Sequence, residues 1–415
     1  MILAEYENIR IHDIIISRNI KTYFHPVVSV KKKSIVGFEA LSRGICTIDS
    51  KVIPPSILFN LAEKEELTID LDRLCREKAL ACFKHVLFDK DNLLLLFLNV
   101  DASIIGKDNA CYSELINLVD KLNINPNNIV IEIVESKVND AKALEKFVNA
   151  YKNHGFLIAL DDVGVGHSNM SRISIAKPDV LKIDKSLVKD INKEYYKQEV
   201  LKSLVNLAKN IGSLVVAEGI EREEEAISIL ELGVDMLQGY YFSKPQMVDS
   251  ACIKLVNNKI NHIASRFKNY MVEKISNQKS VQKMSRAIVS NIVEQLSVIP
   301  LEYIDRKLME MVDSYRAIEC IYVLDESGIQ LSETICNYNK LPRQQKFIFK
   351  PAQKGSDHSL KDYYLFISTG LNIYITEPYI SLASGNLCVT VSAKCTNCYD
   401  DKVLILCVDL NQKCL

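Results

Sequence analysis

The sequence predicts an α/β fold followed by a long helix and a smaller α+β domain, and three observations lead to this prediction. Between about residues 20 and 245, short apolar runs rich in β-branched residues alternate with segments of helical periodicity. Helical periodicity then continues from about residue 248 to 296 with few turn signals. Beyond about residue 300, apolar runs alternate with turn residues. Repeated strand and helix units are typical of a parallel barrel, so we expect a modified (β/α)8 TIM-like barrel first.

The elements of the barrel follow from composition and period. The apolar, β-branched runs that we expect to form strands are Tyr23–Val30, Ile35–Leu41, Leu93–Val100, Ile129–Val134, Leu157–Leu160, Val180–Ile183, Leu214–Ala217 and Met236–Phe242. The amphipathic segments that we expect to form helices are Ser56–Glu66, Asp72–Leu87, Ala141–Asn153, Lys193–Ile211 and Arg222–Leu232. Only "KKKS" joins the first two strands, which is hairpin length, so we expect one strand to run antiparallel to its neighbours.

The chain as a whole is expected to have three parts. We expect a barrel domain over residues 1–247, a helical linker over 248–296 and a separate domain over 297–415. In that last domain the runs "IECIYVLD", "DYYLFIST", "NLCVTVSA" and "VLILCVDL" are expected to form a mostly antiparallel sheet.

Composition and charge exclude several classes of protein. Apolar residues make up 48% and charged residues 25% of the chain, which is typical of a globular protein. The formal net charge of −1 creates no long-range field to hold duplex DNA, so a nucleotide partner should be small. The longest apolar runs are too short to span a membrane and the first residues lack a signal-peptide pattern, so we expect a cytoplasmic protein. The 12 cysteines lack framework spacing and are expected to be reduced thiols.

Polar residues fall at or just past the carboxyl end of nearly every predicted strand. They are Glu39, Asn99, Glu132, Asp161, Asp162, Lys182, Asp184, Glu218 and Gln238. In a barrel these ends converge on the face where such enzymes keep their chemistry. The alternative is that each residue caps a strand in solvent, but crowded carboxylates repel one another unless cations lie among them. Hard oxygen ligands with one amide suit Mg²⁺ or Mn²⁺, so we expect a divalent metal site.

The stretch "IALDDVGVG" places Asp161 and Asp162 side by side after an apolar strand. Adjacent residues of a regular strand point to opposite faces. Both carboxylates can therefore serve one site only if the strand ends there and the following glycines bend the backbone. Two such carboxylates would bridge two ions roughly 3.5–4 Å apart, the spacing used for in-line displacement at phosphorus.

These residues resemble the EAL-domain cyclic di-GMP phosphodiesterases. The triplet Glu39, Ala40 and Leu41 lies in "GFEALSRG", and the ordered series "FLNVD", "IEIVES", "ALDDVGVG", "KPDVLKID", "VVAEGIE" and "LQGYYFSKP" extends the resemblance over about residues 20 to 247. The resemblance implies hydrolysis of one phosphodiester bond of cyclic di-GMP to linear pGpG. It also implies two Mg²⁺ or Mn²⁺ ions, with ligands at Glu39, Asn99, Glu132, Asp161 and Asp162.

The same resemblance implies further roles. Lys182 and Glu218 would position and activate the attacking water, and Gln238 would complete the site. The positions implied near the substrate or in its supporting shell are His25, Leu41, Arg43, Asp184 and Glu221, and Glu135 would steady the loop after the paired aspartates. His25 replaces the glutamine of the family's "FQP". We interpret this change as an adjustment of a guanine or phosphate contact and not as its loss. Val163, Val165 and His167 make that loop unusual, and since the family's barrels pair beside it, we expect a homodimer with altered control of the loop.

The second domain resembles a PAS or Cache-like sensor. The stretch "EPYISLASGNLCVTVSAKC" resembles the core hairpin of such domains. One interpretation is a pocket for a small ligand or a redox signal that adjusts the barrel through the linker helix; the other is a dimerisation module with an empty pocket. Cys395 and Cys398 form a single CxxC, which keeps a redox role open although buried inert thiols are the commoner case.

Two rival functions remain at this point. One is a catalytically silent receptor that binds cyclic di-GMP and signals through the C-terminal domain, and the other is an unrelated metal-dependent barrel enzyme such as a lyase. A degenerate receptor is expected to lose metal ligands, and every ligand position here is filled. The sequence therefore favours the enzyme.

Overall fold

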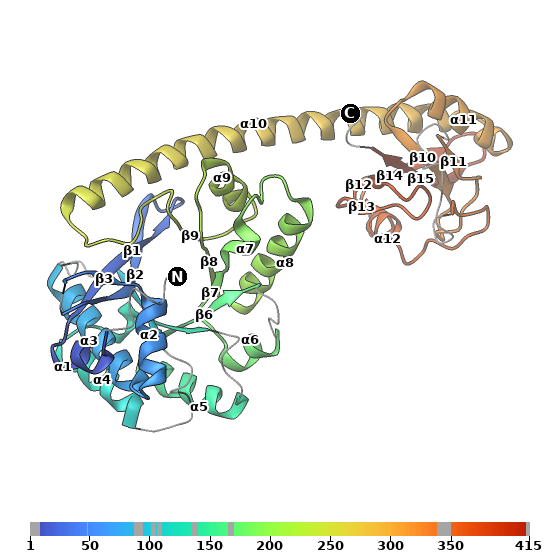
Figure 1. Ribbon diagram of the computed structural model, residues 1–415. Coiled ribbons are helices and arrows are strands. Elements are labelled where there is room, and N and C mark those ends of the chain that lie inside the picture. Colours follow the sequence, from blue (N-terminus) through green and yellow to red (C-terminus); the bar gives the residue numbers. More distant parts are fainter. Residues whose placement is uncertain are drawn as a thin grey trace. The chain divides into compact units, whose positions relative to one another are not determined.

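The computed structural model describes residues 9–47, 49–86, 94–100, 105, 110–134, 140–164, 170–337 and 350–411. The chain divides into two compact units, Met1–Met271 and Val272–Leu415 (Figure 1). Of the helices in the described ranges, none is long and apolar enough to cross a membrane.

The first unit is a closed barrel. Its strands are β1 (Ile20–Ser29), β2 (Ser34–Ile45), β4 (Leu95–Val100), β5 (Ile129–Val134), β6 (Leu157–Val163), β7 (Val180–Ile183), β8 (Leu214–Ala217) and β9 (Met236–Gln238). They follow the order β1-β9-β8-β7-β6-β5-β4-β2, and pairing of β1 with β2 closes the ring. β1 is antiparallel to both neighbours and the other pairs are parallel. The predicted modified TIM-like barrel with one antiparallel strand is confirmed.

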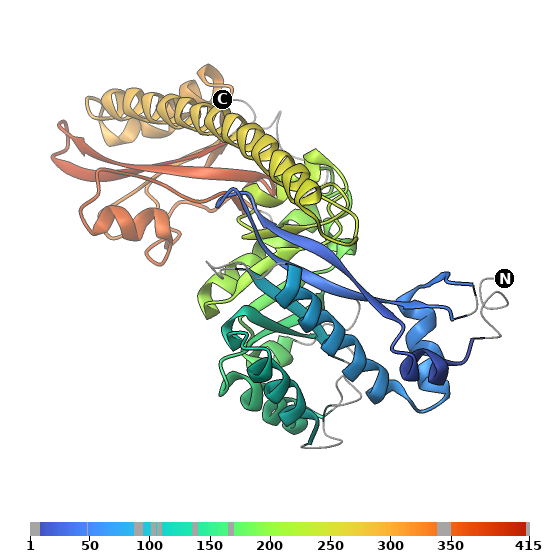
Figure 2. The same cartoon turned by 90° about the vertical axis from the view of Figure 1, so that its left-hand side faces the viewer.

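The hairpin at the start of the barrel is longer than the sequence predicted. β1 and β2 form a two-stranded ribbon that reaches beyond the barrel toward α1 (Ile11–Ile16) and α2 (Pro55–Lys64) (Figure 2). β3 (Val52–Ile53) extends the far end of β2. A small apolar core of its own packs there, because residues such as Ile14, Ile53 and Leu58 are fully buried.

Helices cover the outside of the barrel. After α2 they are α3 (Thr68–Val86), α4 (Ala110–Lys121), α5 (Ala141–Lys152), α6 (Met170–Ala176), α7 (Lys185–Val188), α8 (Tyr195–Ile211) and α9 (Glu223–Glu231). The main apolar core lies between these helices and the outward side chains of the strands. The five predicted helices of the barrel are present with ends shifted by a few residues, whereas α1, α4, α6 and α7 were not predicted.

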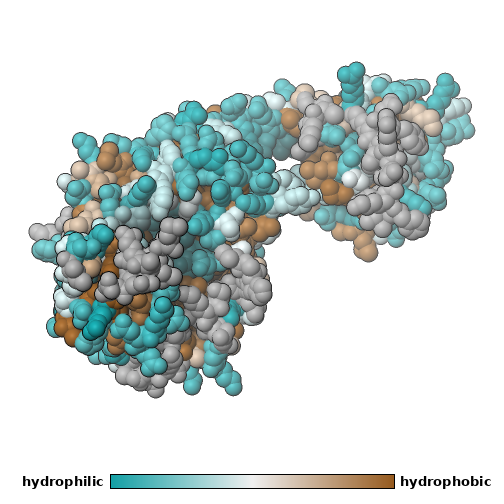
Figure 3. Space-filling view, in the orientation of Figure 1, coloured by the Kyte–Doolittle hydropathy of each residue, from teal (hydrophilic) through white to brown (hydrophobic). Residues whose placement is uncertain are grey.

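The long helix α10 spans Ser250–Leu296, 47 residues. Near its start, Val256, Ile260 and Ile263 belong to the apolar core of the barrel. Near its end, Ile292 and Leu296 belong to the apolar core of the second unit. The surface along α10 is mainly hydrophilic in the space-filling view (Figure 3). The predicted linker helix is therefore present, and each end of it contributes to a core.

The second unit is built on an antiparallel sheet. Its strands are β10 (Ile318–Leu324), β11 (Ile335–Cys336), β12 (Ile373–Ile375), β14 (Leu387–Asn397) and β15 (Lys402–Leu410), in the order β11-β10-β15-β14-β12, with β13 (Tyr379–Ile380) paired to β14. α11 (Ile304–Ser314) precedes the sheet. One prediction here is wrong, because "DYYLFIST" forms helix α12 (Asp362–Ser368). Tyr363 and Ile367, four residues apart, are its buried side chains, which is a helical spacing.

Candidate active site

Inward-facing residues fill the barrel in layers. One apolar layer takes a residue from each of several strands, namely Val27, Phe97, Val130, Ala159, Val180, Val216 and Met236. Side chains two residues apart on a strand share a face. The next inward positions toward the carboxyl ends are accordingly His25, Asn99, Glu132, Asp161, Lys182, Glu218 and Gln238. Most of the sequence-predicted polar residues therefore form one layer next to the apolar one; Asp162 and Asp184 are not among these positions.

Lys182 lies at the centre of this polar layer and is 1% exposed. Its Nζ is 2.5 Å from Glu132 Oε1 and 2.7 Å from Glu218 Oε1. Asp161 Oδ1 follows at 3.5 Å and Glu39 Oε1 at 3.8 Å. The geometry thus brings four of the predicted carboxylates around one ammonium group.

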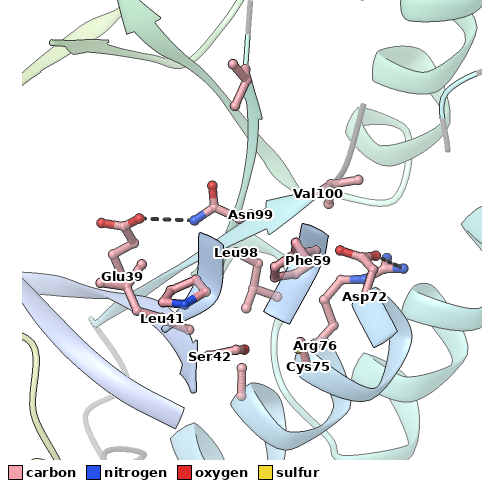
Figure 4. A pocket seen from close by; sticks show the side chains of 14 residues that line it. Glu39, Leu41, Ser42, Phe59, Asp72, Cys75, Arg76, Leu98, Asn99 and Val100 are labelled. Carbon is pink, nitrogen blue, oxygen red and sulfur yellow. Dashed lines mark hydrogen bonds and ion pairs between the residues drawn. The ribbon is translucent and has the colours of Figure 1, made fainter. Parts of the chain in front are cut away.

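Two amide side chains orient Glu39 from either side. Asn99 Nδ2 donates to Glu39 Oε1 at 3.0 Å, and Gln238 Nε2 donates to Glu39 Oε2 at 2.7 Å. Figure 4 shows the Asn99 contact at the edge of a pocket. Because both carboxylate oxygens accept a hydrogen bond, the plane of the Glu39 carboxylate is fixed.

Burial and charge shift the titration of this cluster. Burial raises the pKa of Glu132 well above its usual value, and burial raises the pKa of Glu218 to about 8 despite the nearby ammonium. Burial opposes the charge of Lys182, but the surrounding carboxylates raise its pKa well above its ordinary value. Burial likewise opposes ionisation of Glu39, yet Lys182, His25 and the two amide donors lower the pKa of Glu39. The cluster as it stands holds more acid groups than the one ammonium can neutralise.

The donor set fits additional cations. Glu132 Oε2 and Gln238 Oε1 are buried and accept no hydrogen bond. These oxygen atoms accept no hydrogen bond and lie beside carboxylates whose negative charge is not fully neutralised. Hard divalent cations stabilise such an environment. In the described residues, however, no group of three or more His, Cys, Asp and Glu side chains is arranged as a set of metal ligands. Three of the predicted ligands, Glu39, Glu132 and Asp161, lie around Lys182 instead.

The paired aspartates lie in a β-bulge, which differs from the prediction that the strand ends before them. β6 continues to Val163, and between Leu160 and Val163 its register against β7 shifts. Asp162 itself takes a left-handed backbone conformation, with φ of 56°, and its N–H donates to Asp161 Oδ1 at 2.9 Å. The bend therefore lies at Asp162, two residues before Gly164, which also has a positive φ, of 104°.

The predicted substrate contacts have different local environments. His25 is paired with Glu39 across the β1–β2 ladder, and burial lowers the pKa of its imidazole. Arg43 Nη1 donates to Ser42 O at 2.9 Å, and its guanidinium lies 5.4 Å from the Tyr23 ring centre. Leu41 lines the pocket of Figure 4.

Two further predicted residues stand past the strand ends. The Asp184 carboxylate caps α7 by accepting from Ser186 N at 2.8 Å. Glu221 N–H donates to Glu225 Oε2 at 3.2 Å, just before α9. Neither observation places these two side chains in the cluster around Lys182. Glu135, Val165 and His167 lie outside the described residues.

A cavity of about 280 Å³ opens beside Glu39 and Asn99. Its walls come from β2, α2, α3, β4 and β5, and its lining residues are Glu39, Ala40, Leu41, Ser42, Pro55, Phe59, Asp72, Cys75, Arg76, Ala79, Leu98, Asn99, Val100 and Val134 (Figure 4). The sequence analysis missed the residues from α2 and α3. A signal was present, since Asp72 and Arg76 are charged residues four apart on a face of α3 that is otherwise apolar.

In the second unit, the CxxC cysteines point to separate partners. The Cys395 thiol is buried and donates to Val293 O of α10 at 3.6 Å, and burial raises the pKa of Cys395 to about 11. Cys398 is exposed and contacts Thr396 O. A raised thiol pKa disfavours the reactive thiolate at Cys395.

The fold and the polar layer define a (β/α)8 barrel with an acidic, lysine-centred site at the carboxyl ends of its strands. Comparison with known proteins is consistent with this class: the EAL domain matches residues 10–245, and the chain belongs to the EAL domain family. The resemblance of the barrel to the EAL domain is confirmed.

Relatives match over different lengths. The EAL-domain containing protein YkuI of Bacillus subtilis is 24% identical over 386 residues, which are 89% of this chain and 90% of YkuI. The crystal structure of YkuI with cyclic di-GMP and calcium superposes with a TM-score of 0.80 at 24% identity, covering 97% of this chain and 99% of that one. This likeness extends the shared fold to the second unit.

Other relatives match the barrel alone. The cyclic di-GMP phosphodiesterase PdeA of Borreliella burgdorferi is 30% identical over 227 residues, 54% of this chain but only 33% of PdeA. BlrP1 of Klebsiella pneumoniae, solved with manganese and cyclic di-GMP, has a TM-score of 0.51 at 26% identity and covers 55% of this chain and 56% of its own. The chain thus spans about a third of PdeA and about half of BlrP1.

Proposed function

We propose that the barrel hydrolyses one phosphodiester bond of cyclic di-GMP to give linear pGpG. The observation that carries this proposal is the polar layer, in which Lys182 holds Glu132 and Glu218 within 2.7 Å and lies within 3.8 Å of Asp161 and Glu39. Support comes from PdeA, a cyclic di-GMP phosphodiesterase at 30% identity, and from BlrP1, whose complexes contain cyclic di-GMP with calcium or manganese.

The proposal includes divalent cations, with Mg²⁺ or Mn²⁺ as the candidates. Glu39, Asn99, Glu132, Asp161 and Asp162 are the residues that would hold them. When bound, such cations activate water and neutralise charge that develops on a phosphoryl group. The bulge at Asp162 supports this assignment, because it breaks the alternation that would send neighbouring aspartates to opposite faces.

The chain's own residues would then orient the reactants. Asn99 and Gln238 fix the plane of the Glu39 carboxylate. Lys182 holds Glu132 and Glu218 in place. The Glu218 side chain is 23% exposed, so it could exchange a proton with water. Arg43, with its fork of donors, is the candidate partner for a phosphate oxygen. His25, Leu41, Asp184 and Glu221 are retained as candidates for contacts near the substrate.

The deciding experiment is incubation of the pure protein with cyclic di-GMP and either Mg²⁺ or Mn²⁺, followed by chromatography of the products. We expect pGpG to form, and Glu39→Ala to abolish its formation while the circular dichroism spectrum stays native. Tight binding of cyclic di-GMP without product would favour the silent receptor. Absence of both binding and turnover would favour an unrelated metal-dependent barrel enzyme.

Regulation by the second unit is part of the same proposal. We retain a barrel over residues 1–247, a linker over 248–296 and a PAS or Cache-like sensor over 297–415. The sensor would favour one of two positions of the loop after the paired aspartates, and the chain would form a homodimer. Support comes from α10, because one continuous helix contributes residues to the core of the barrel near its start and to the core of the second unit near its end. The test compares the full chain with a chain ending at Met271, which keeps the part of α10 that belongs to the barrel's core. Equal turnover and equal oligomeric state would refute the regulatory role.

A further inference from the structure

One carboxylate joins the two chain segments that follow β7 and β8. Glu225, in the first turn of α9, is 2% exposed. Its Oε1 accepts from Asp190 N at 3.0 Å, and its Oε2 accepts from Glu221 N at 3.2 Å. Asp190 follows β7, the strand that carries Lys182, and Glu221 lies in the turn that begins at Glu218 after β8. Glu225 therefore bridges the segment behind Lys182 and the turn of Glu218.

Arg222 completes this bridge. Its backbone N–H donates to Glu225 Oε2 at 3.1 Å. Its Nη2 donates to Glu225 Oε1 at 2.6 Å and to Asp190 Oδ1 at 2.8 Å. Burial opposes ionisation of Glu225, but the Arg222 guanidinium and the N–H groups of Asp190 and Glu221 lower the pKa of Glu225. Both oxygens of this carboxylate therefore accept hydrogen bonds from the two segments themselves.

The turn that begins at Glu218 also packs tightly against α7. Gly219 has φ of 70°, and a Cβ atom at this position would lie 2.4 Å from Lys185 Cβ. Lys185 is the first residue of α7, which follows the strand of Lys182. The two segments are thus in close contact on one side and are joined by Glu225 through hydrogen bonds.

The capping of α9 accounts for only part of this arrangement. In a capping box the third helical residue accepts from the backbone N–H of the N-cap residue, as Glu225 does from Arg222. The bond from Asp190 N comes from 35 residues away in the sequence and belongs to no such cap. This bond therefore links two loops at the carboxyl ends of neighbouring strands, where the polar layer lies.

We propose that Glu225 is a positioning residue that holds the turn of Glu218 against the segment behind Lys182 and so maintains the 2.7 Å contact between Lys182 Nζ and Glu218 Oε1. The inference rests on the proposed function and deepens it. In that function Lys182 and Glu218 position and activate the attacking water, so a displaced Glu218 slows the chemical step. A misplacement of about 1 Å can cost about 100-fold in rate. Glu225 has its oxygens turned to the protein, so it acts on kcat and not on the binding of cyclic di-GMP.

The test uses the full chain and substitutes two glutamates of the same helical turn. Glu225→Met keeps an unbranched side chain and removes both acceptor oxygens, whereas Glu225→Gln keeps one of them. The matched control is Glu224→Met, because Glu224 is exposed and removing it takes the same charge from the first turn of α9. If Glu225→Met does not fold, Glu225→Asp replaces it, since aspartate keeps the charge but is one CH2 group too short for the bridge.

Four quantities are measured for each variant. They are kcat and KM for cyclic di-GMP in Mg²⁺ or Mn²⁺, the affinity and stoichiometry of cyclic di-GMP binding by calorimetry in Ca²⁺, the melting temperature, and amide hydrogen exchange over residues 184–193 and 214–222. Ca²⁺ is the ion present in the YkuI and BlrP1 complexes. The calorimetric stoichiometry counts the folded binding sites, so kcat is expressed per site and a loss through unfolding is separated from a loss of rate.

We expect Glu225→Met to lower kcat per site by about 10- to 100-fold while KM and the affinity in Ca²⁺ stay unchanged. Glu225→Gln should lose less, because one oxygen still accepts from one of the two segments. Hydrogen exchange should become faster over both segments in Glu225→Met. Glu224→Met should match the parent in kcat, KM and exchange.

The two proposals fail in distinguishable ways. A parent that binds cyclic di-GMP but forms no pGpG refutes the hydrolysis, and hydrogen exchange alone then decides whether Glu225 holds the two segments. A parent that forms pGpG, with Glu225→Met at the parental kcat per site, overturns the role of Glu225. Unchanged exchange over both segments overturns it as well, and so does a loss that appears in KM and affinity instead of kcat.

Discussion

Replacing Lys182 with methionine should destabilise the barrel, and the effect can be estimated from its contacts. The substitution removes the buried ammonium that lies 2.5 Å from the fully buried Glu132 and 2.7 Å from Glu218, whose side chain is 23% exposed. Removing one partner of a buried ion pair costs about 3–5 kcal/mol, because an uncompensated charge stays behind. Since each kcal/mol lowers Tm by roughly 2–4 °C for a domain of this size, Lys182→Met should melt about 10 °C lower in EDTA.

Two conditions should restore part of the stability that Lys182→Met loses. Lowering the pH lets Glu132 and Glu218 take up protons, and their raised pKa values mean that this happens at unusually high pH. Divalent cations should also restore stability, since a ligand at about 100 times its Kd contributes about 2.7 kcal/mol. The assay is thermal melting followed by circular dichroism, with EDTA or Mn²⁺, at pH 5.5 and pH 8.

The control for this prediction is Lys193→Met, because the Lys193 side chain is 66% exposed and its ion pair with Asp190 is 3.9 Å long. Exposed ion pairs contribute about 0–1 kcal/mol to stability, so this variant should have the same melting temperature as the parent. If Lys182→Met in EDTA melts within about 2 °C of the parent, the cluster is not held by its ammonium group. The electrostatic account of the site would then be wrong.

Three further predictions follow from other contacts. Hydrolysis of cyclic di-GMP should stop in excess EDTA and return with Mg²⁺ or Mn²⁺; full activity in the chelator would refute the metal requirement. Gln238→Leu removes the donor to Glu39 Oε2, and should lower kcat by at least about tenfold while Tm changes by only a few degrees. Burial raises the pKa of Asp409 to about 6 from 3.8, so the folded second unit binds the proton more tightly than the unfolded chain does. Its stability should therefore fall by about 3 kcal/mol as pH rises from 3 to 7, and denaturant titrations of the parent and Asp409→Asn, which should lose this slope, measure it.

The local sequence pattern was sufficient to predict the barrel and most of its polar layer. A strand has a side-chain period of two, so an apolar residue and a polar one two positions later, such as Val130 and Glu132, must share the inward face wherever the strand is regular. Repetition of that pattern in successive strands places the polar residues in one layer before any contact is known. This is why β5, β7 and β8 have the bounds that the sequence predicts, and why Glu132, Lys182 and Glu218 meet.

Features that depend on packing between distant segments could not be read from the chain. The bulge at Asp162 arises where β6 slips by one residue against β7, and a slip is a property of two strands together. The charged pair Asp72 and Arg76 on an otherwise apolar helix face is visible in the sequence, but only the packing of α3 beside β2 and β4 turns that face toward the cavity. The run "DYYLFIST" is equally apolar as a strand or a helix, and burial of Tyr363 and Ile367 against the sheet selects the helix. In each case the local energies are close, and contacts between residues far apart in the sequence decide the outcome.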